Sequence, residues 1–236
     1  MTNGHVASVK LTNRPAYYLE TVTVDTSRGQ VSVPIAYGGQ WYAFVGAAAM
    51  GLAVEPRCVP ELVQVAGRVR ALLAQAVRRP DPRTNQPPRM ENIMWVDDPA
   101  DARVDGRNMP VNRAGGFDRS PCGTGTSARL AVLHAAGRLT VGEEYVNSGI
   151  LGTVYHARIV ETTEVAGVAA VIPEITGSAW LTGRSRALDQ SSGPTRSGIP
   201  PLSVTTRPVA RTPLRSAAVA RDRHRPRSHR HPTVDR

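Results

Sequence analysis

Alternating hydrophobic and polar residues mark the first third of the chain. Residues 6–13 and 19–25 alternate with a period of two, which predicts strands, and 31–36 is predicted as a third strand. The turn at 27–30 makes the second and third of them a hairpin, and a glycine pair precedes a further strand at 40–45. Residues 60–77 change to helical spacing, and the buried stripe predicted for this helix is Leu62, Val65, Val69, Leu72 and Leu73.

The pattern resumes after a proline-rich break at 80–89. Strands are predicted at 91–96 and near 108–112, and a helix at 122–136 that Gly137 ends. Four further β-like segments follow, at 152–160, 163–166, 168–172 and 175–182. The break at 80–89 is the predicted boundary between two units. Residues 1–79 are expected to be the remnant of an N-terminal lobe, and 80–183 a C-terminal lobe that carries Cys122.

Charge separates a third segment, 184–236, from the rest. The whole chain carries a net charge of +10, but this segment alone holds twelve arginines against three aspartates. It contains no aromatic residue and shows no periodicity, which predicts a disordered tail. Three interpretations stay open: an out-of-frame product of a GC-rich gene, which we favour, an inert tail, or a basic arm for nucleic acid. Residues 1–183 are nearly neutral, so a nucleic-acid partner is not expected.

Two cysteines exclude a disulfide scaffold and are typical of a protein of the reducing cytoplasm. No apolar run approaches the ~20 residues that cross a bilayer, so no membrane partner is expected.

Residues 118–128 (DRSPCGTGTSA) carry the most informative chemistry. Cys122 stands at the predicted start of a helix, where backbone N–H groups and the helix dipole favour a thiolate. The N–H groups of Gly123 and Thr124 are free to hold a carboxylate, and Asp118 can face an ammonium group. These groups together suit an α-amino acid, although a capped helix with an inert cysteine fits the spacing equally well.

The same segment closely resembles the cysteine motif of the proline racemase family, which also includes hydroxyproline 2-epimerases and trans-3-hydroxyproline dehydratases. The resemblance runs in order over residues 4–183, and further matching segments are 35–43 (IAYGGQWYA), 133–137 (LHAAG) and 173–180 (PEITGSAW).

The resemblance implies an α/β (α+β) fold of the diaminopimelate epimerase type, in which strands wrap around a central helix in each of two lobes. Here one complete lobe and part of a second are expected. It also implies catalysis by two cysteines on opposite faces of the substrate, without metal or other cofactor. Cys122 matches one acid/base, Asp118 the group that binds the amine, and Gly123 and Thr124 the carboxylate cradle.

Two departures from the family pattern accompany this match. The family's other cysteine segment is absent, and Cys58, the second cysteine here, matches no catalytic stretch and is predicted to be structural. After Gly183 the family's closing segment is replaced by the basic tail. We therefore expect a truncated family member with little or no activity of its own.

The resulting prediction is a racemase or epimerase of proline or hydroxyproline, impaired as this chain. A dehydratase of the same family ranks lower because that branch typically has threonine at position 122. A non-catalytic amino-acid-binding protein is the other alternative. His134 and His156 are predicted to be structural or exposed, and a homodimer is the candidate assembly.

Overall fold

A computed structural model describes residues 4–99 and 101–183, which contain nine strands and two α-helices. The strands are β1 (His5–Thr12), β2 (Ala16–Thr26), β3 (Gly29–Tyr37), β4 (Trp41–Gly46), β5 (Asn92–Asp97), β6 (Gly106–Val111), β7 (Glu144–Ser148), β8 (Val154–Val165) and β9 (Val168–Trp180). The helices are α1 (Val59–Ala76) and α2 (Gly123–Ala135), with short 3-10 turns at Ala48–Met50 and Pro56–Cys58.

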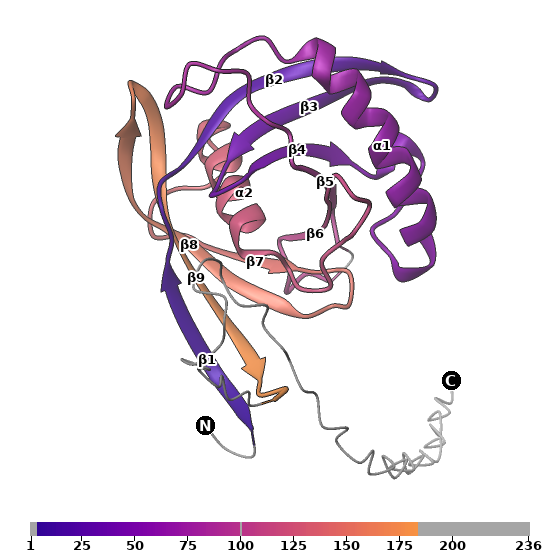
Figure 1. The fold of residues 1–236 in the computed structure, drawn as a ribbon. Helices are drawn as coiled ribbons and strands as arrows, with labels where there is room; N and C mark the ends of the chain where they lie inside the picture. The colour runs from indigo at the N-terminus through magenta and orange to yellow at the C-terminus, as the bar shows by residue number, and fades with distance from the viewer. Residues whose placement is uncertain (1–3, 100, 184–236) are drawn as a thin grey trace, which may run out of the picture. The chain divides into compact units, whose positions relative to one another are not determined.

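Strands β2 to β9 close into an eight-stranded barrel (Figure 1). Neighbouring strands pair in chain order, and β9 returns to β2 through Ala16↔Val171 and Tyr17↔Ala170. Two pairs are parallel, β4 with β5 and β6 with β7, and each is bridged by a connection that contains one of the helices. Strand β1 lies outside the ring and pairs with the far end of β9.

Helix α2 runs through the barrel, where β2, β3, β8 and β9 are its main neighbours (Figure 1). Eight of its thirteen residues are buried, so apolar or small side chains occur all around it and not along one stripe. One cluster on this helix faces β4 and β5 through Ala128 and Val132, and another faces β8 and β9 through Leu130 and Leu133. The central helix that the sequence predicted is confirmed.

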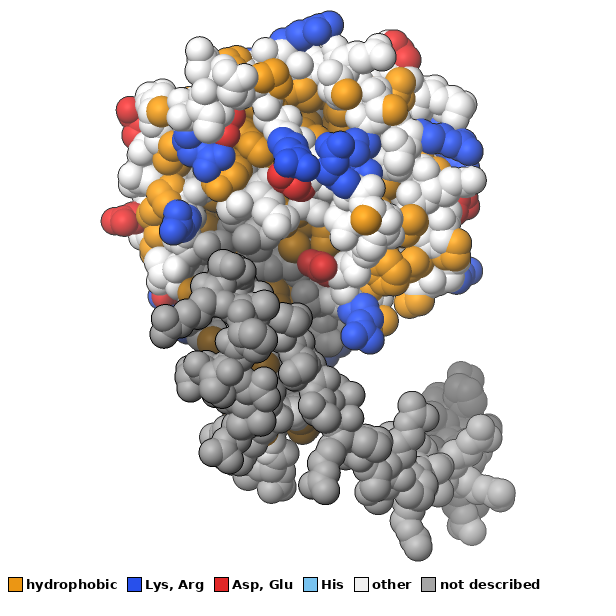
Figure 2. All heavy atoms as spheres, viewed as in Figure 1, with side chains coloured by type: hydrophobic (Ala, Val, Ile, Leu, Met, Phe, Trp, Pro, Cys, Tyr) orange, Lys and Arg blue, Asp and Glu red, His pale blue; other side chains and the backbone are white. Residues whose placement is uncertain are grey.

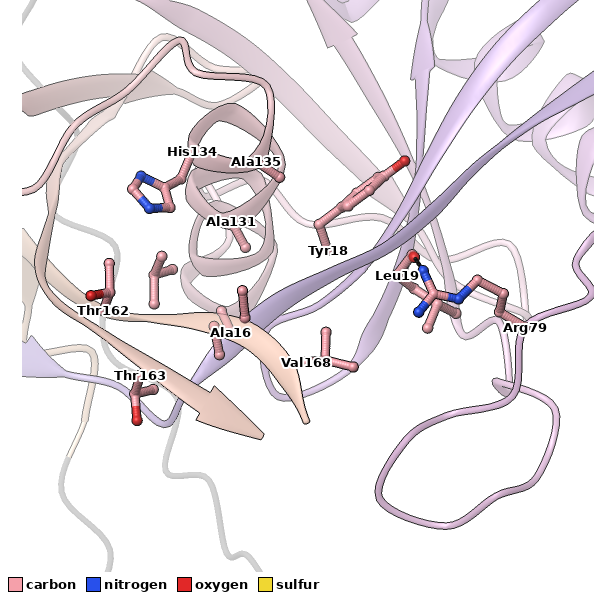
Figure 3. Close-up of a pocket in the computed structure, with 13 residues that line it drawn as sticks. Ala16, Tyr18, Leu19, Arg79, Ala131, His134, Ala135, Thr162, Thr163 and Val168 are labelled. Carbon is pink, nitrogen blue, oxygen red and sulfur yellow. Dashed lines mark hydrogen bonds between the residues drawn. The ribbon is translucent and has the colours of Figure 1, made fainter. Parts of the chain in front are cut away.

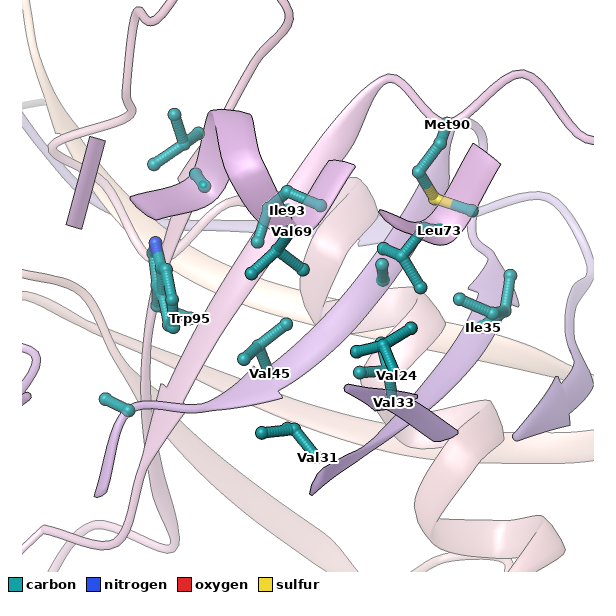
Figure 4. Packing of buried hydrophobic residues seen from close by; sticks show 14 of the residues in the cluster. Val24, Val31, Val33, Ile35, Val45, Val69, Leu73, Met90, Ile93 and Trp95 are labelled. Atoms are coloured by element: carbon teal, nitrogen blue, oxygen red, sulfur yellow. The ribbon is translucent and has the colours of Figure 1, made fainter. Parts of the chain in front are cut away.

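Helix α1 covers the outer face of the same barrel wall. In Figure 4 its Val69 and Leu73 lie against Val24, Val33 and Val45 of the strands beneath. The buried stripe is as predicted except for Leu72, which is 38% exposed. Because α1 packs outside and α2 inside, the wall between them is buried on both faces, and residues 41–45 (WYAFV) are all buried.

The structure does not divide the chain at residue 80. Strands β2, β3 and β4 come from residues before the proline-rich segment, yet they belong to the same barrel as β5 to β9. Residues 1–79 therefore do not form the remnant of a separate lobe, and 80–89 is a connection from α1 to β5. The predicted tail, 184–236, lies outside the described residues.

The strand predictions after residue 140 need two corrections. The four predicted segments are two long strands, β8 and β9, joined at the turn Ala166-Gly167, where both residues have positive φ. Strand β7 was not predicted. Among the helices of the described residues, none is long and apolar enough to cross a membrane.

Candidate active site

Cys122 is the residue just before α2, and it follows the Ser120-Pro121 turn. Its backbone has φ 64° and ψ 104°, a conformation that L-residues rarely adopt. Such strain typically costs about 1–3 kcal/mol and persists only where surrounding contacts impose it. The side chain is only 5% exposed and packs against Tyr42 and Met94 of the barrel wall.

Two glycines allow the parts of this site to approach closely. A Cβ at Gly125 would lie 2.1 Å from Met94 Cε and 3.0 Å from Cys122 Sγ. A Cβ at Gly38, in the β3–β4 turn, would lie 2.3 Å from the carbonyl oxygen of Thr124. At Gly38 the neighbours are backbone atoms, so glycine is required there for the turn and α2 to lie together, whereas at Gly125 the absence of a Cβ leaves room for the sulfur and the end of the Met94 side chain.

A buried side chain from β7 fixes the turn that precedes Cys122. Asn147 Nδ2 donates to the Pro121 carbonyl oxygen at 3.2 Å and to Thr126 Oγ1 at 2.8 Å. Thr126 Oγ1 in turn donates to the same carbonyl at 3.1 Å. Since Asn147 and Thr126 are both buried, these bonds replace water at the turn and hold its geometry.

The electrostatics of the sulfur differ from the sequence expectation. Burial raises the pKa of the Cys122 thiol to about 11, and the nearby Asp118 carboxylate raises it further. Hydrogen bonds from Tyr42 and from the Gly125 N–H act in the opposite direction but do not offset burial. The helix start alone predicted a favoured thiolate, whereas the buried thiol keeps its proton at neutral pH.

The structure brings the predicted site residues to one end of α2. Asp118 is exposed, and Gly123 and Thr124 are half-buried in the first turn of the helix. Within the described part of the chain, no hydrogen bond uses the N–H groups of Gly123 or Thr124. These two donors are thus available to an anion beside the sulfur.

The other titratable candidates lie elsewhere. Cys58 precedes α1 and packs against the outer core, on the opposite side of the wall from Cys122. His134 sits at the far end of α2 and bonds to the Leu139 carbonyl oxygen at 2.9 Å, and the exposed His156 lies 3.3 Å from Glu144. These positions are in keeping with the prediction that they are structural or exposed groups.

Tyr42 is a site residue that the sequence reasoning missed. Its Oη lies 3.4 Å from Cys122 Sγ and 2.6 Å from Thr124 Oγ1. The signal was the alternation within β4, because Tyr42 and Phe44 share the face toward α2 while Ala43 and Val45 face α1. Without knowing which helix lies on which face, that alternation does not place Tyr42 beside the cysteine.

Two cavities in the described residues lie apart from Cys122. One, of about 250 Å³, opens between β2, the β8–β9 hairpin and the last turn of α2, with Tyr18, His134 and Arg79 on its wall (Figure 3). The other, of about 330 Å³, lies beside Trp41 and contains the Asp81–Arg83 ion pair. On the face drawn in Figure 2, basic side chains stand in separate groups among acidic and hydrophobic ones.

Comparisons with known proteins agree on one family. The family model for proline racemase matches residues 1–200. A proline racemase from Clostridioides difficile is 36% identical over 200 residues, which are 84% of this chain and 60% of that protein. A 4-hydroxyproline epimerase from Brucella ovis is 35% identical over 181 residues, 76% of this chain and 54% of that protein.

Solved structures give the same result. A probable proline racemase from Agrobacterium radiobacter K84 with bound carbonate superposes with a TM-score of 0.69 at 34% identity, over 79% of this chain and 55% of that one. A hydroxyproline epimerase from Agrobacterium vitis with bound trans-4-hydroxy-L-proline has a TM-score of 0.68 at 33% identity, over 76% and 52%. The chain thus spans about half to three-fifths of these relatives.

Proposed function

Because the chain belongs to the proline racemase family, we propose that it carries one side of an amino-acid racemase or epimerase site. The observation that carries this proposal is the juxtaposition at the start of α2. A buried cysteine sulfur there adjoins two backbone N–H groups that the described residues leave free for an anion. The substrate class is proline or hydroxyproline, in keeping with the relatives' names.

Each group has a defined part in the proposed chemistry. The Gly123 and Thr124 N–H groups bind the substrate carboxylate, and Asp118 pairs with the secondary ammonium. Cys122 Sγ takes the α-proton when it is a thiolate, or returns one when it is a thiol. Charge that develops on the carboxylate as the proton leaves is stabilised by the same N–H groups. No cofactor has a step in this scheme.

The raised pKa of Cys122 bears on both proton transfers. A thiol with a pKa of about 11 is rarely ionised at neutral pH, but its thiolate is a stronger base than an ordinary cysteine. The thiol form is ready to donate a proton to the carbanion. Removal of the α-proton therefore needs either high pH or a substrate-bound state in which the thiolate is better stabilised.

Inversion at a tetrahedral carbon needs a second acid/base group on the opposite face. Cys58, the remaining cysteine of this sequence, packs on the other side of the barrel wall and cannot reach the same carbon. We therefore propose that this chain by itself inverts its substrate slowly or not at all. Loss of one member of a cooperating catalytic pair usually removes most of the rate.

A non-catalytic amino-acid-binding protein is the second candidate, and the protonated state of the buried Cys122 favours it. Such a protein would bind the substrate through the same carboxylate cradle and the same Asp118 contact, but its Cys122 sulfur would take no part in proton transfer. The two candidates differ only in whether the α-proton exchanges with solvent in a Cys122-dependent way. The dehydratase alternative predicts water loss from 3-hydroxyproline, which a product assay separates.

Ligand recognition is tested by titrating proline against the 15N-labelled chain. We expect shifts of the Gly123 and Thr124 amide resonances with proline, and none with prolinamide, which lacks the carboxylate. N-acetylproline, which lacks the ammonium, should bind more weakly, and Asp118→Asn should remove that difference. Equal shifts with proline and prolinamide would contradict the cradle.

A further inference from the structure

Tyr42 reaches Cys122 from beneath the first turn of α2. Its side chain is 1% exposed, and its Oη lies 3.4 Å from Cys122 Sγ and 2.6 Å from Thr124 Oγ1. Gln40 Oε1 lies 3.4 Å from the same hydroxyl and is itself held by Asn92 Nδ2 at 2.8 Å. The tyrosine hydroxyl is therefore fixed from three sides next to the sulfur.

The hydrogen-bonding capacity of these groups gives them two arrangements. When Cys122 is a thiol, its S–H can donate to Tyr42 Oη, while the Tyr42 hydroxyl donates to Thr124 or Gln40. When Cys122 is a thiolate, the Thr124 hydroxyl can donate to Tyr42 Oη while Tyr42 donates to the sulfur. Only hydroxyl hydrogens turn between the two arrangements, so no heavy atom moves.

The surrounding charges keep Tyr42 in the role of a donor. Burial, and next the charge of Cys122, raise the pKa of Tyr42 far above its ordinary value, so its hydroxyl retains its proton. Around the sulfur, Met94 on β5 is apolar, Asp118 precedes the turn and disfavours the thiolate, and Tyr42 on β4 favours it. Besides the Gly125 N–H, Tyr42 is thus the group on the barrel wall that opposes the effect of burial.

We propose that Tyr42 is a positioning residue for Cys122. The Tyr42 and Thr124 hydroxyls form a hydrogen-bonded pair that reorients when Cys122 loses its proton and so stabilises the thiolate. This inference rests on the proposed function only in treating Cys122 as the reacting group. The hydroxyl pair allows a thiolate to form on a buried cysteine whose other surroundings favour the thiol. The proposal also assigns the Thr124 side chain a role separate from that of its backbone N–H.

The test is the alkylation rate of each cysteine by iodoacetamide between pH 7 and 10, resolved by peptide mass spectrometry. In Tyr42→Phe we expect Cys122 to react about ten- to hundredfold more slowly at a given pH, because a charge-assisted hydrogen bond is lost. Cys58 in the same sample is the internal control and keeps its rate. Tyr18→Phe, whose hydroxyl bonds to Thr21, is the matched control and leaves Cys122 unchanged.

Thr124→Val keeps the backbone donor and removes only the hydroxyl, and we expect Cys122 to react roughly threefold more slowly, with recovery in Thr124→Ser. An unchanged alkylation rate of Cys122 in Tyr42→Phe overturns the proposal. Faster alkylation of both cysteines also overturns it, because that result shows that Tyr42 serves only in packing. If Tyr42→Phe does not fold, an unchanged rate in Thr124→Val is decisive against it. No substrate is present, so these outcomes are independent of whether the site acts on proline.

Discussion

Substituting Gly38 with alanine should disrupt the contact between the β3–β4 turn and α2. The added Cβ would lie 2.3 Å from the Thr124 carbonyl oxygen and 2.5 Å from the Ala128 nitrogen. Both are backbone atoms of α2, so neither can turn aside as the end of a flexible side chain would. Ordinary contact begins near 3.4 Å, and the turn and the helix must therefore separate by about 1 Å.

The magnitude follows from the cost of overpacking. Forcing an extra methyl group into a well-packed interior typically costs about 1–3 kcal/mol, and the rigid neighbours here favour the upper part of that range. Gly67→Ala is the matched control, because Gly67 is exposed within α1 and its Cβ would have no heavy atom within 4 Å. That change should stabilise the protein by up to ~1 kcal/mol through helix propensity.

Urea denaturation followed by circular dichroism measures both effects. We expect Gly38→Ala to unfold at a lower urea concentration with an unchanged m-value, and Gly67→Ala at an equal or higher one. Because the shift separates Tyr42 from Cys122, the alkylation rate of Cys122 should change in Gly38→Ala as well. A Gly38→Ala protein within about 0.5 kcal/mol of wild type, with unchanged Cys122 reactivity, would refute the close packing of the β3–β4 turn on α2.

Two further predictions concern the same region. Asn147→Ala should lower the free energy of unfolding by about 1–3 kcal/mol, because the buried Pro121 carbonyl and Thr126 hydroxyl each lose a donor. Thermal denaturation measures this loss, with an alanine substitution at an exposed residue as the control. Because the folded-state pKa of Cys122 is about 11, above its unfolded value near 8.5, the thiol contributes stability at low pH that declines as pH rises. Urea midpoints between pH 7.5 and 9.5 should fall more steeply for wild type than for Cys122→Ser, and parallel slopes would show that the thiol titrates normally.

Local patterns were enough to predict most elements of the barrel. The strand at 91–96 and the helix at 122–136 were predicted correctly, because alternation, capping glycines and apolar content are patterns that extend over only a few neighbouring residues. The parallel pairing of β4 with β5 was not foreseen, since it joins segments separated by the whole of α1. The supposed boundary at 80–89 failed for the same reason, because proline content reports a break in periodicity and not which strands pair.

The local arrangement around Cys122 was predicted from the sequence, but its electrostatics were not. The motif at 118–128 placed Cys122, Gly123 and Thr124 together because they are consecutive at a helix start. The direction of the cysteine pKa was wrong, since burial by Met94 and Tyr42 comes from strands distant in sequence. For the same reason Tyr42 was missed, although it lies within a segment already matched to the family.

The most direct test of the central claim is deuterium incorporation at the α-carbon of proline and 4-hydroxyproline, followed by NMR in D2O with the purified chain. We predict slow exchange that increases with pH, disappears in Cys122→Ser and is retained in Cys58→Ser, with little inversion of configuration. Exchange that persists without Cys122 would contradict its role as the acid/base. Efficient inversion by this chain would contradict the claim that it supplies one side of the site.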